Sequence, residues 1–326
     1  MKYRMLGEFF WIILGAASVI NAVPARAQYP SRPILVVVPA GPGGAADLLA
    51  RTVAPKLSAA WGQPVIVESR VGASGNIGGE VVAKSAPDGY TLMFTPPGPV
   101  GINMFLSKQI PFDPLTAFAP VSVLGAIPNI LIVGPTVPAK NVGEFVAYAK
   151  ANPGKLTYGS VGIGTTLHLT AAMLAFAAGI DIVHVPYNGM PPMFADLLGS
   201  RLDFAIANAT VVLPQVEGGR VRALAVASSK RFYALPNTPT FIEAGYRDFV
   251  SAVWMSFAGP AGMSPEIVRK WYEELVKIVK MPDVQARFAK LGLEAWASTP
   301  AEMRQQMEAE VKRWGDVIRR TRATGD

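Results

Sequence analysis

The sequence of 326 residues contains no cysteine and only two histidines, His168 and His184. Without cysteine there can be no disulfide bond, no thiolate nucleophile and no cysteine-ligated metal site. The two histidines are too few and too far apart for a zinc motif, and no cluster of Asp and Asn residues indicates an oxygen-ligated site. The sequence therefore predicts no metal site.

Familiar catalytic and nucleotide-binding motifs are also missing. Ser74 and Ser160 lie among glycines, but neither has the Gly-x-Ser-x-Gly spacing of a hydrolase nucleophile. No glycine turn continues into the Lys-Ser/Thr pair of a P-loop, and Gly162-x-Gly164 lacks the third glycine of a dinucleotide fingerprint. We expect a protein that is not an enzyme and has no cofactor; an exported hydrolase with an unrecognised catalytic set is the alternative.

The sequence also lacks a large excess of positive or negative charge. The net charge is +7, and Lys2, Arg4 and Arg26 against Glu8 account for two of these positive charges. The remaining basic residues alternate with acidic ones along helix-like segments, which is typical of a solvated surface. We expect no nucleic-acid binding.

One long apolar run exists, and it lies at the N-terminus. Lys2 and Arg4 precede the run from Phe9 to Val23, and the small-x-small sequence Ala25-Arg26-Ala27 follows it. This order predicts a secretory signal peptide over residues 1–27, with cleavage after Ala27. A retained membrane anchor is the alternative, but the run is short for a span. The mature chain should not span a membrane.

The rest of the chain alternates between β-like and helix-like segments. The run Ile34 to Val38 is apolar and β-branched, as in a buried parallel strand, and a helix-like segment follows it from Ala45 to Ala60. The pattern recurs through both halves and predicts an α/β fold of parallel sheets covered by helices. The C-terminal helices are expected at Pro265–Val279, Pro282–Leu291 and Pro300–Arg319.

The length favours two domains. Apolar segments at Val121–Val133 and Val250–Gly259 are candidate crossings between them. Two crossings would make the first lobe discontinuous. We predict lobe 1 from residues 28–127 plus 250–326, and lobe 2 from residues 128–249.

Two glycine-rich turns, Pro39–Asp47 and Ser160–His168, each follow a β-like run and precede a helix-like one. Glycine lets the backbone approach a ligand closely, and a helix N-terminus presents free N–H groups with partial positive charge. The ends of parallel strands should bring both turns, Thr95–Gly98 and Tyr187–Asn188 around one cleft. We expect the two turns to hold an anion there.

An ordered set of motifs resembles the Bug-type, TctC-like solute-binding receptors of tripartite tricarboxylate transporters. The motifs are Tyr29-Pro30-Ser31-Arg32-Pro33-Ile34, Pro-Gly-Gly-x-x-Asp ending at Asp47, Gly75-Asn76-Ile77-Gly78, Ala86-Pro87-Asp88-Gly89-Tyr90-Thr91, Phe118-Ala119-Pro120-Val121-Ser122, Pro153-Gly154-Lys155-Leu156, Gly162-x-Gly164-Thr165-x-x-His168-Leu169, Val183-His184-Val185-Pro186-Tyr187, Arg222-Ala223-Leu224-Ala225-Val226 and Pro236-x-x-Pro239-Thr240. The resemblance implies a type II periplasmic binding protein, with two α/β lobes around a ligand cleft. It also implies a monomer in the periplasm that captures a small organic carboxylate and delivers it to membrane transporter subunits; a ligand-sensing receptor for a signalling system is the alternative.

The resemblance and the cleft position together give the candidate ligand-binding residues. They are Ala40, Gly43, Gly44, Ala45, Asp47, Gly98, Ser160, Gly164, Thr165, Thr166, His168, Tyr187, Asn188 and Asn208. Some have other readings. Asp47 could be a first-turn carboxylate that interacts favourably with the helix dipole. His168 could cap or pack its own helix, and Tyr187 and Asn188 could belong to a turn.

Three positions depart from the family pattern. Ala40 replaces a common aromatic, Ala207-Asn208 replaces a common Asp-Asn pair, and Pro96–Pro99 makes a usually hydroxyl-bearing loop rigid. Without the acid, an amino-acid ligand would lack a partner for its ammonium group. We therefore expect a ligand with at least one carboxylate and no essential ammonium, such as a dicarboxylate or an aromatic carboxylate.

Overall fold

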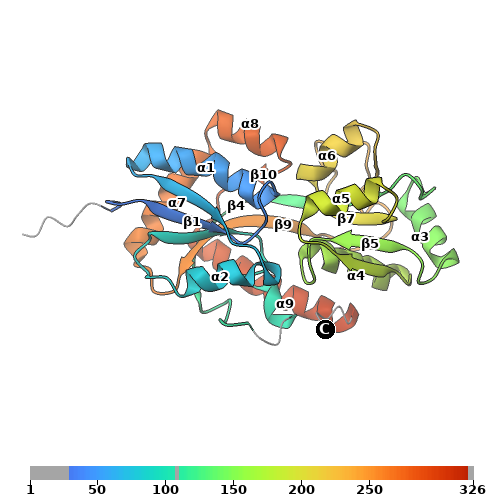
Figure 1. Cartoon of the computed structure of the whole chain (residues 1–326), viewed down its shortest axis with the longest axis horizontal. Coiled ribbons are helices and arrows are strands. Elements are labelled where there is room, and N and C mark those ends of the chain that lie inside the picture. The colour runs from blue at the N-terminus through green and yellow to red at the C-terminus, as the bar shows by residue number, and fades with distance from the viewer. Residues whose placement is uncertain (1–28, 107–109, 322–326) are drawn as a thin grey trace, which may run out of the picture.

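The structure is a computed structural model that describes residues 29–106 and 110–321; the predicted signal peptide lies outside these residues. Ten strands of the described chain form one hydrogen-bonded array, in the order β2-β1-β3-β9-β4-β7-β5-β6, with β8 and β10 also paired to β4. We call the part from β2 to the first half of β4 lobe 1 and the part from the second half of β4 to β6 lobe 2 (Figure 1). The strands are β1 (Ile34–Val38), β2 (Val65–Ser69), β3 (Thr91–Thr95), β4 (Phe118–Val133), β5 (Thr157–Ser160), β6 (Val183–Pro186), β7 (Phe204–Asn208), β8 (Arg222–Val226), β9 (Ala252–Pro260) and β10 (Glu294–Ala295).

The expectation of parallel sheets is only partly right. Strand β1 pairs in parallel with β2 and β3, and its buried β-branched residues suit a strand covered on both faces. Strand β9, however, runs antiparallel to β3 and β4, and β4 runs antiparallel to β7 and β8. Strand β9 thus runs against the βα units of lobe 1, and β4 runs against those of lobe 2, although in lobe 1 β4 has the same direction as β3. Both parts of the sheet are mixed.

Helices cover both faces of the sheet (Figure 1): α1 and α8 lie on one side of lobe 1, with α2 and α9 on the other. In lobe 2, α5 and α6 lie opposite α4. The helices are α1 (Ala45–Trp61), α2 (Asn76–Ala83), α3 (Val142–Ala151), α4 (Thr166–Ala178), α5 (Met190–Leu198), α6 (Ala209–Glu217), α7 (Pro265–Val279), α8 (Pro282–Lys290) and α9 (Pro300–Thr321), with short 3-10 turns η1 (Ala73–Gly75) and η2 (Ile102–Phe105).

The strand pairing of β4 changes between Pro128, which faces β9, and Asn129, which faces β7. Asn129 Nδ2 donates to Thr170 Oγ1 at 3.1 Å and to Ser251 Oγ at 2.9 Å, and all three residues are fully buried. Ser251 immediately precedes β9. A buried polar node therefore ties both crossing segments to α4; the residue boundaries predicted for the two lobes stay a prediction.

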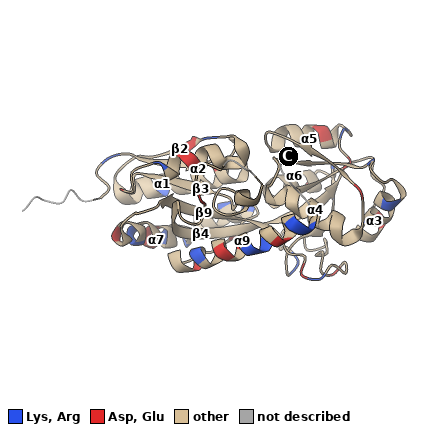
Figure 2. Ribbon diagram, turned by 90° about the horizontal axis from the view of Figure 1, so that it is seen from below, with Lys and Arg blue, Asp and Glu red and all other residues tan. Residues whose placement is uncertain are grey.

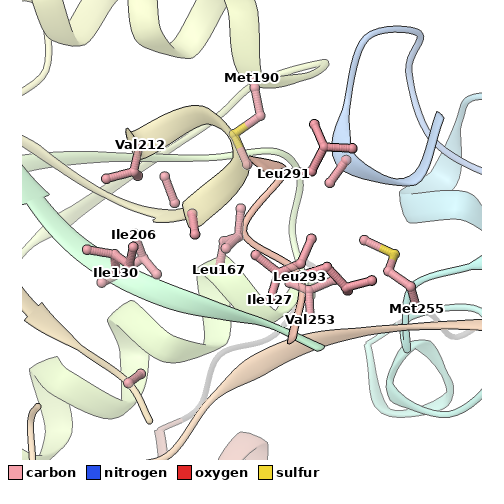
Figure 3. Packing of buried hydrophobic residues seen from close by; sticks show 14 of the residues in the cluster. Ile127, Ile130, Leu167, Met190, Ile206, Val212, Val253, Met255, Leu291 and Leu293 are labelled. Carbon is pink, nitrogen blue, oxygen red and sulfur yellow. The ribbon is translucent and has the colours of Figure 1, made fainter. Parts of the chain in front are cut away.

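The hydrophobic core is continuous through the crossing. One cluster of buried residues includes Ile127, Val253 and Leu293 beside the crossing as well as Ile206 and Val212 of lobe 2 (Figure 3). Burial of such side chains is the main stabilising contribution to folding. The two lobes therefore share one core.

The C-terminal helix α9 also joins the lobes. It runs beneath β4 toward α4 (Figure 2). Trp314 and Ile318 of α9 pack with Ile102 of η2 and Leu169 of α4 in a separate buried cluster. The last helix of the chain is thus part of the packing of both lobes.

Candidate functional site

The first glycine turn connects β1 to α1. Gly43 has a positive φ of 74°, and its N–H donates to Asp47 Oδ2 at 3.0 Å. Asp47 Oδ1 accepts from Arg51 Nε at 2.9 Å. The carboxylate of Asp47 therefore closes the turn onto its own helix. The N–H groups of Ala45 and Ala46, at the start of α1, have no acceptor within the described part of the chain.

The second glycine turn connects β5 to α4. Gly164 has a φ of 79°, and its N–H donates to His168 Nδ1 at 3.1 Å. Thr165 caps α4, because its Oγ1 accepts from the N–H of His168 at 3.4 Å. The N–H groups of Thr166 and Leu167 have no acceptor among residues 29–106 and 110–321. This helix, like α1, begins with free donors.

A cavity of about 560 Å³ lies between the two turns. Ala45 and Ala46 line it from α1, and Thr166 and Leu167 line it from α4, so the first turns of both helices, whose N–H groups are free, lie at one cavity. Opposed helix N-termini form a site of positive potential for an anion. The arrangement can hold a carboxylate without any cationic side chain.

The structure brings most of the predicted site residues to this cavity. Those that line it are Ala40, Gly44, Ala45, Gly98, Thr165, Thr166, Tyr187, Asn188 and Asn208. Those that do not line it are Gly43, Asp47, Ser160, Gly164 and His168. The second group belongs to the turns themselves, and Asp47 and His168 fix the shape of the turns through their hydrogen bonds to Gly43 and Gly164. Contact of either group with a ligand stays a prediction.

His168, His184 and Tyr158 form a stack behind the second turn. The two imidazole rings are 4.3 Å apart, and the ring of Tyr158 lies 4.8 Å from that of His184. Burial lowers the pKa of His168 to about 4, with a further decrease from the neighbouring His184, and burial lowers the pKa of His184 to about 4. Both rings are therefore neutral at pH 7, so His168 Nδ1 is available as the acceptor for Gly164.

Asn208 is a buried polar residue of the cavity wall. It is 6 % exposed, caps α6 without a side-chain hydrogen bond, and its Oδ1 has no partner in the described structure. A buried unpaired amide costs free energy unless a ligand or water completes it. Asn208 is thus the lining side chain most in need of an external partner.

Sequence reasoning missed several lining residues. Ser74 of η1 lines the cavity and donates to the carbonyl of Ile163 at 2.7 Å. Val253 and Met255 come from β9, and Pro191 and Pro192 from the start of α5. The glycines around Ser74 were a usable signal. Strand β9 offered no such signal, because nearly all of its residues are buried and polar and apolar residues do not alternate along it.

No group of three or more potential His, Cys, Asp or Glu metal ligands occurs in the described part of the chain. None of the helices in residues 29–106 and 110–321 has both the length and the apolarity of a membrane span.

Two α/β lobes that meet over a cavity between opposed helix N-termini define a bilobal solute-binding protein of the type II periplasmic class. A family model described as a tripartite tricarboxylate transporter family receptor matches residues 49–322, and the chain belongs to this family. The predicted family and fold class are both confirmed.

Individual relatives cover nearly the whole chain. Protein BugT of Bordetella pertussis is 34% identical over 324 residues, which are 99% of each chain. The structure of Rpa4515 from R. palustris with adipate has a TM-score of 0.86 at 34% identity, over 90% of this chain and 98% of that one. The structure of the periplasmic binding protein BugD has a TM-score of 0.85 at 32% identity, over 91% of this chain and 99% of that one.

Proposed function

We propose that the mature protein captures a small organic carboxylate between its two lobes in the periplasm and delivers it to a tripartite tricarboxylate-type membrane transporter. The observation that supports capture is the convergence of free N–H groups from α1 and α4 on one cavity. A similar protein, Rpa4515, has been solved with adipate, which is a carboxylate. The protein acts as a receptor and performs no catalysis.

The ligand-binding residues proposed for this function are those named from the sequence. Ala45 and Thr166 supply backbone donors, and Asn208 supplies an uncharged polar side chain. Gly164 and His168 act by holding the second turn in shape. A carboxylate bound to backbone N–H groups in a site sheltered from water gains charge-assisted hydrogen bonds.

Binding is tested by thermal shift and titration calorimetry on residues 28–326, with a panel of mono-, di- and tricarboxylates and aromatic acids. Each acid is paired with its primary amide, which has a similar shape and no charge. A ligand that binds only the native state raises the melting temperature by mass action. We expect at least one acid to bind at least tenfold more tightly than its amide. If every amide matches its acid, the anion site is wrong.

Export and delivery need separate measurements. N-terminal sequencing of exported protein should give Gln28, and a cytoplasmic protein that retains Met1 would contradict the periplasmic location. Deletion of the receptor should abolish uptake of the ligand. If deletion instead leaves uptake unchanged and removes only a transcriptional response to the ligand, the sensing alternative replaces delivery.

A further inference from the structure

Asn188 is followed by glycine, and no other asparagine of the sequence is. The pair lies in the bend between β6 and α5, where Asn188 is exposed and lines the cavity. In an Asn-Gly pair the side-chain amide and the next backbone nitrogen can meet with little steric hindrance, because glycine has no Cβ. Whether they react depends on how firmly the surrounding groups are held.

The groups of this pair are unrestrained. The side-chain amide of Asn188 makes no hydrogen bond with the described residues, and the backbone N–H groups of Asn188, Gly189 and Met190 have no acceptor there. Pro191 and Pro192 follow, and neither has a backbone N–H. The segment 188–192 therefore donates no backbone hydrogen bond to the rest of the described chain, and it has the freedom that ring closure requires.

The start of α5 adds a favourable electrostatic field. This helix begins at Met190, and its cap, Gly189, has a φ of 127°. Attack on the amide requires the Gly189 nitrogen to lose its proton and places negative charge on Oδ1 of Asn188. The partial positive charge of a helix N-terminus stabilises negative charge at this position. The start of α5 therefore favours ring closure.

We propose that Asn188 is a site of spontaneous covalent modification. The backbone nitrogen of Gly189 bonds to Cγ of Asn188, the Cγ–Nδ2 bond breaks, and ammonia leaves with the proton of the Gly189 N–H group. Water then opens the five-membered succinimide at Cγ to give Asp, or at the backbone carbonyl carbon to give isoAsp. Water is the co-reactant, and either product replaces a neutral amide with a carboxylate.

The consequence for ligand binding rests on the function proposed above. Among the described residues that line the cavity there is no Asp, Glu, Lys, Arg or His. A carboxylate at position 188 has no cationic side chain in this wall to neutralise it, so it repels an anionic ligand. It also replaces the donor Nδ2 with an acceptor oxygen. Modification of Asn188 thus inactivates the receptor as the protein ages.

Peptide mapping by mass spectrometry tests the modification. Residues 28–326 are incubated at pH 8.5 and 37 °C in water enriched in oxygen-18, which labels the oxygen introduced when the succinimide opens. Asn237 is the matched control within the chain: it is also exposed, but the N–H of Thr238 donates to the carbonyl of Leu235 at 3.0 Å. We expect Asn188 to be converted about tenfold or more faster than Asn237, because the β-branched threonine also hinders ring closure. Equal rates would overturn the proposal.

The effect on binding is measured by titration calorimetry, with whichever of adipate, citrate, hexanoate and benzoate binds the fresh protein most tightly. Incubated protein should lose binding sites in proportion to the converted fraction. Asn188→Asp fixes one product and should bind about tenfold or more weakly than the parent protein. Asn237→Asp adds the same charge outside the cavity and should bind as the parent does. Asn188→Gln does not readily close a five-membered ring, so incubation should leave its affinity at its own initial value.

The outcomes separate the two proposals. If Asn188→Asp binds as tightly as the parent protein, or if incubation impairs Asn188→Gln as much as the parent, the inactivating role of Asn188 is overturned while carboxylate capture stands. If no acid of the wider panel binds the fresh protein, the proposed function fails, whereas the rate of conversion at Asn188 is measured without any ligand.

Discussion

Ser74 Oγ donates a hydrogen bond of 2.7 Å to the carbonyl oxygen of Ile163, and this bond joins lobe 1 to lobe 2 beside the cavity. Ser74 has a positive φ of 54° inside η1, a conformation that a non-glycine residue rarely adopts. The acceptor belongs to the second glycine turn. The bond therefore connects one wall of the cavity directly to the segment that begins α4.

Loss of this bond should shorten the lifetime of the ligand complex. Ser74→Ala removes the donor and keeps Cβ, and a hydrogen bond of this kind contributes ~1 kcal/mol. We expect the dissociation rate measured by stopped flow to rise about threefold to fivefold, with a small change in the association rate. Ser85→Ala is the control, because the hydroxyl of Ser85 bonds only within α2 and the turn that follows it. An unchanged dissociation rate would contradict the role of Ser74 in closure.

Gly164→Val should weaken binding about tenfold or more, or at least ~1.4 kcal/mol. The residue has a φ of 79°, and a Cβ there would overlap the side chain of Leu106 in lobe 1. Valine would therefore strain the second turn and press the lobes apart. Titration calorimetry gives the affinity, and circular dichroism checks that the variant is folded.

Two controls separate these causes. Gly179→Val has the same backbone strain, at a φ of 62°, but open space around its Cβ, so it should cost stability and leave affinity unchanged. Lys290→Ala should change neither. If folded Gly164→Val binds as tightly as the parent protein, the second turn does not control binding.

Removal of a single backbone donor should lower affinity for carboxylates. Ala45 is the first residue of α1, where proline is tolerated, and Gly44 before it is already extended, at φ −75° and ψ 169°. We expect Ala45→Pro to weaken binding about tenfold to a hundredfold, the cost of one hydrogen bond to a charged group. Ala45→Val has similar bulk and keeps the N–H, so it is the control. Equal losses in both variants would mean that crowding, not the lost donor, is responsible.

The free energy of unfolding should decrease as the pH is lowered, because two buried histidines are harder to protonate in the folded protein than in the unfolded chain. The folded-state pKa of His168 is lowered to about 4 from an ordinary value near 6.5, so the folded protein takes up this proton less readily than the unfolded chain. The contribution of the neutral ring is fully present above pH 6.5, decreases between pH 6.5 and about 4, and levels off below that. Its ceiling is ~3 kcal/mol for His168, and His184 acts in the same direction.

The measurement is the free energy of unfolding from urea titrations at pH 7.5, 5.5 and 4.5. His168→Asn keeps an acceptor near Gly164 but does not titrate, so it should lose less stability across this range than the parent protein. Parallel pH curves for the two proteins would contradict the assignment. Protonation of Nδ1 would also set two donors, His168 and the N–H of Gly164, against each other.

Local patterns predicted local structure well. The β-branched run of β1 and the glycine turn before α1 specify a strand, a turn and a helix start from neighbouring residues alone. The direction of β9 could not be predicted, because an apolar strand reads the same in parallel and antiparallel pairing. Helix α6 has a weak sequence signal, because Pro214 lies inside it.

The candidate site shows the same limit. The sequence indicated both glycine turns, but it could not show whether a side chain such as that of Asp47 points at a ligand or back at its own turn. Pro192 and Met255 come to the cavity only through packing of distant elements. Their positions depend on the tertiary structure, which residue types and spacing do not encode locally.

The C-terminal helix has a consequence for how the chain folds. The last strands and helices, from Ala252 to Thr321, complete lobe 1, and Trp314 packs against Leu169 of lobe 2. The ribosome synthesises lobe 2 before α9, so lobe 2 lacks its packing against Trp314 until α9 has been made. Lobe 1, whose residues lie on both sides of lobe 2 in the sequence, reaches its native core only after its C-terminal part has been made. We therefore expect truncation before α9 to leave both halves of the molecule exposed to aggregation and proteolysis, and the intact chain to melt in one cooperative transition.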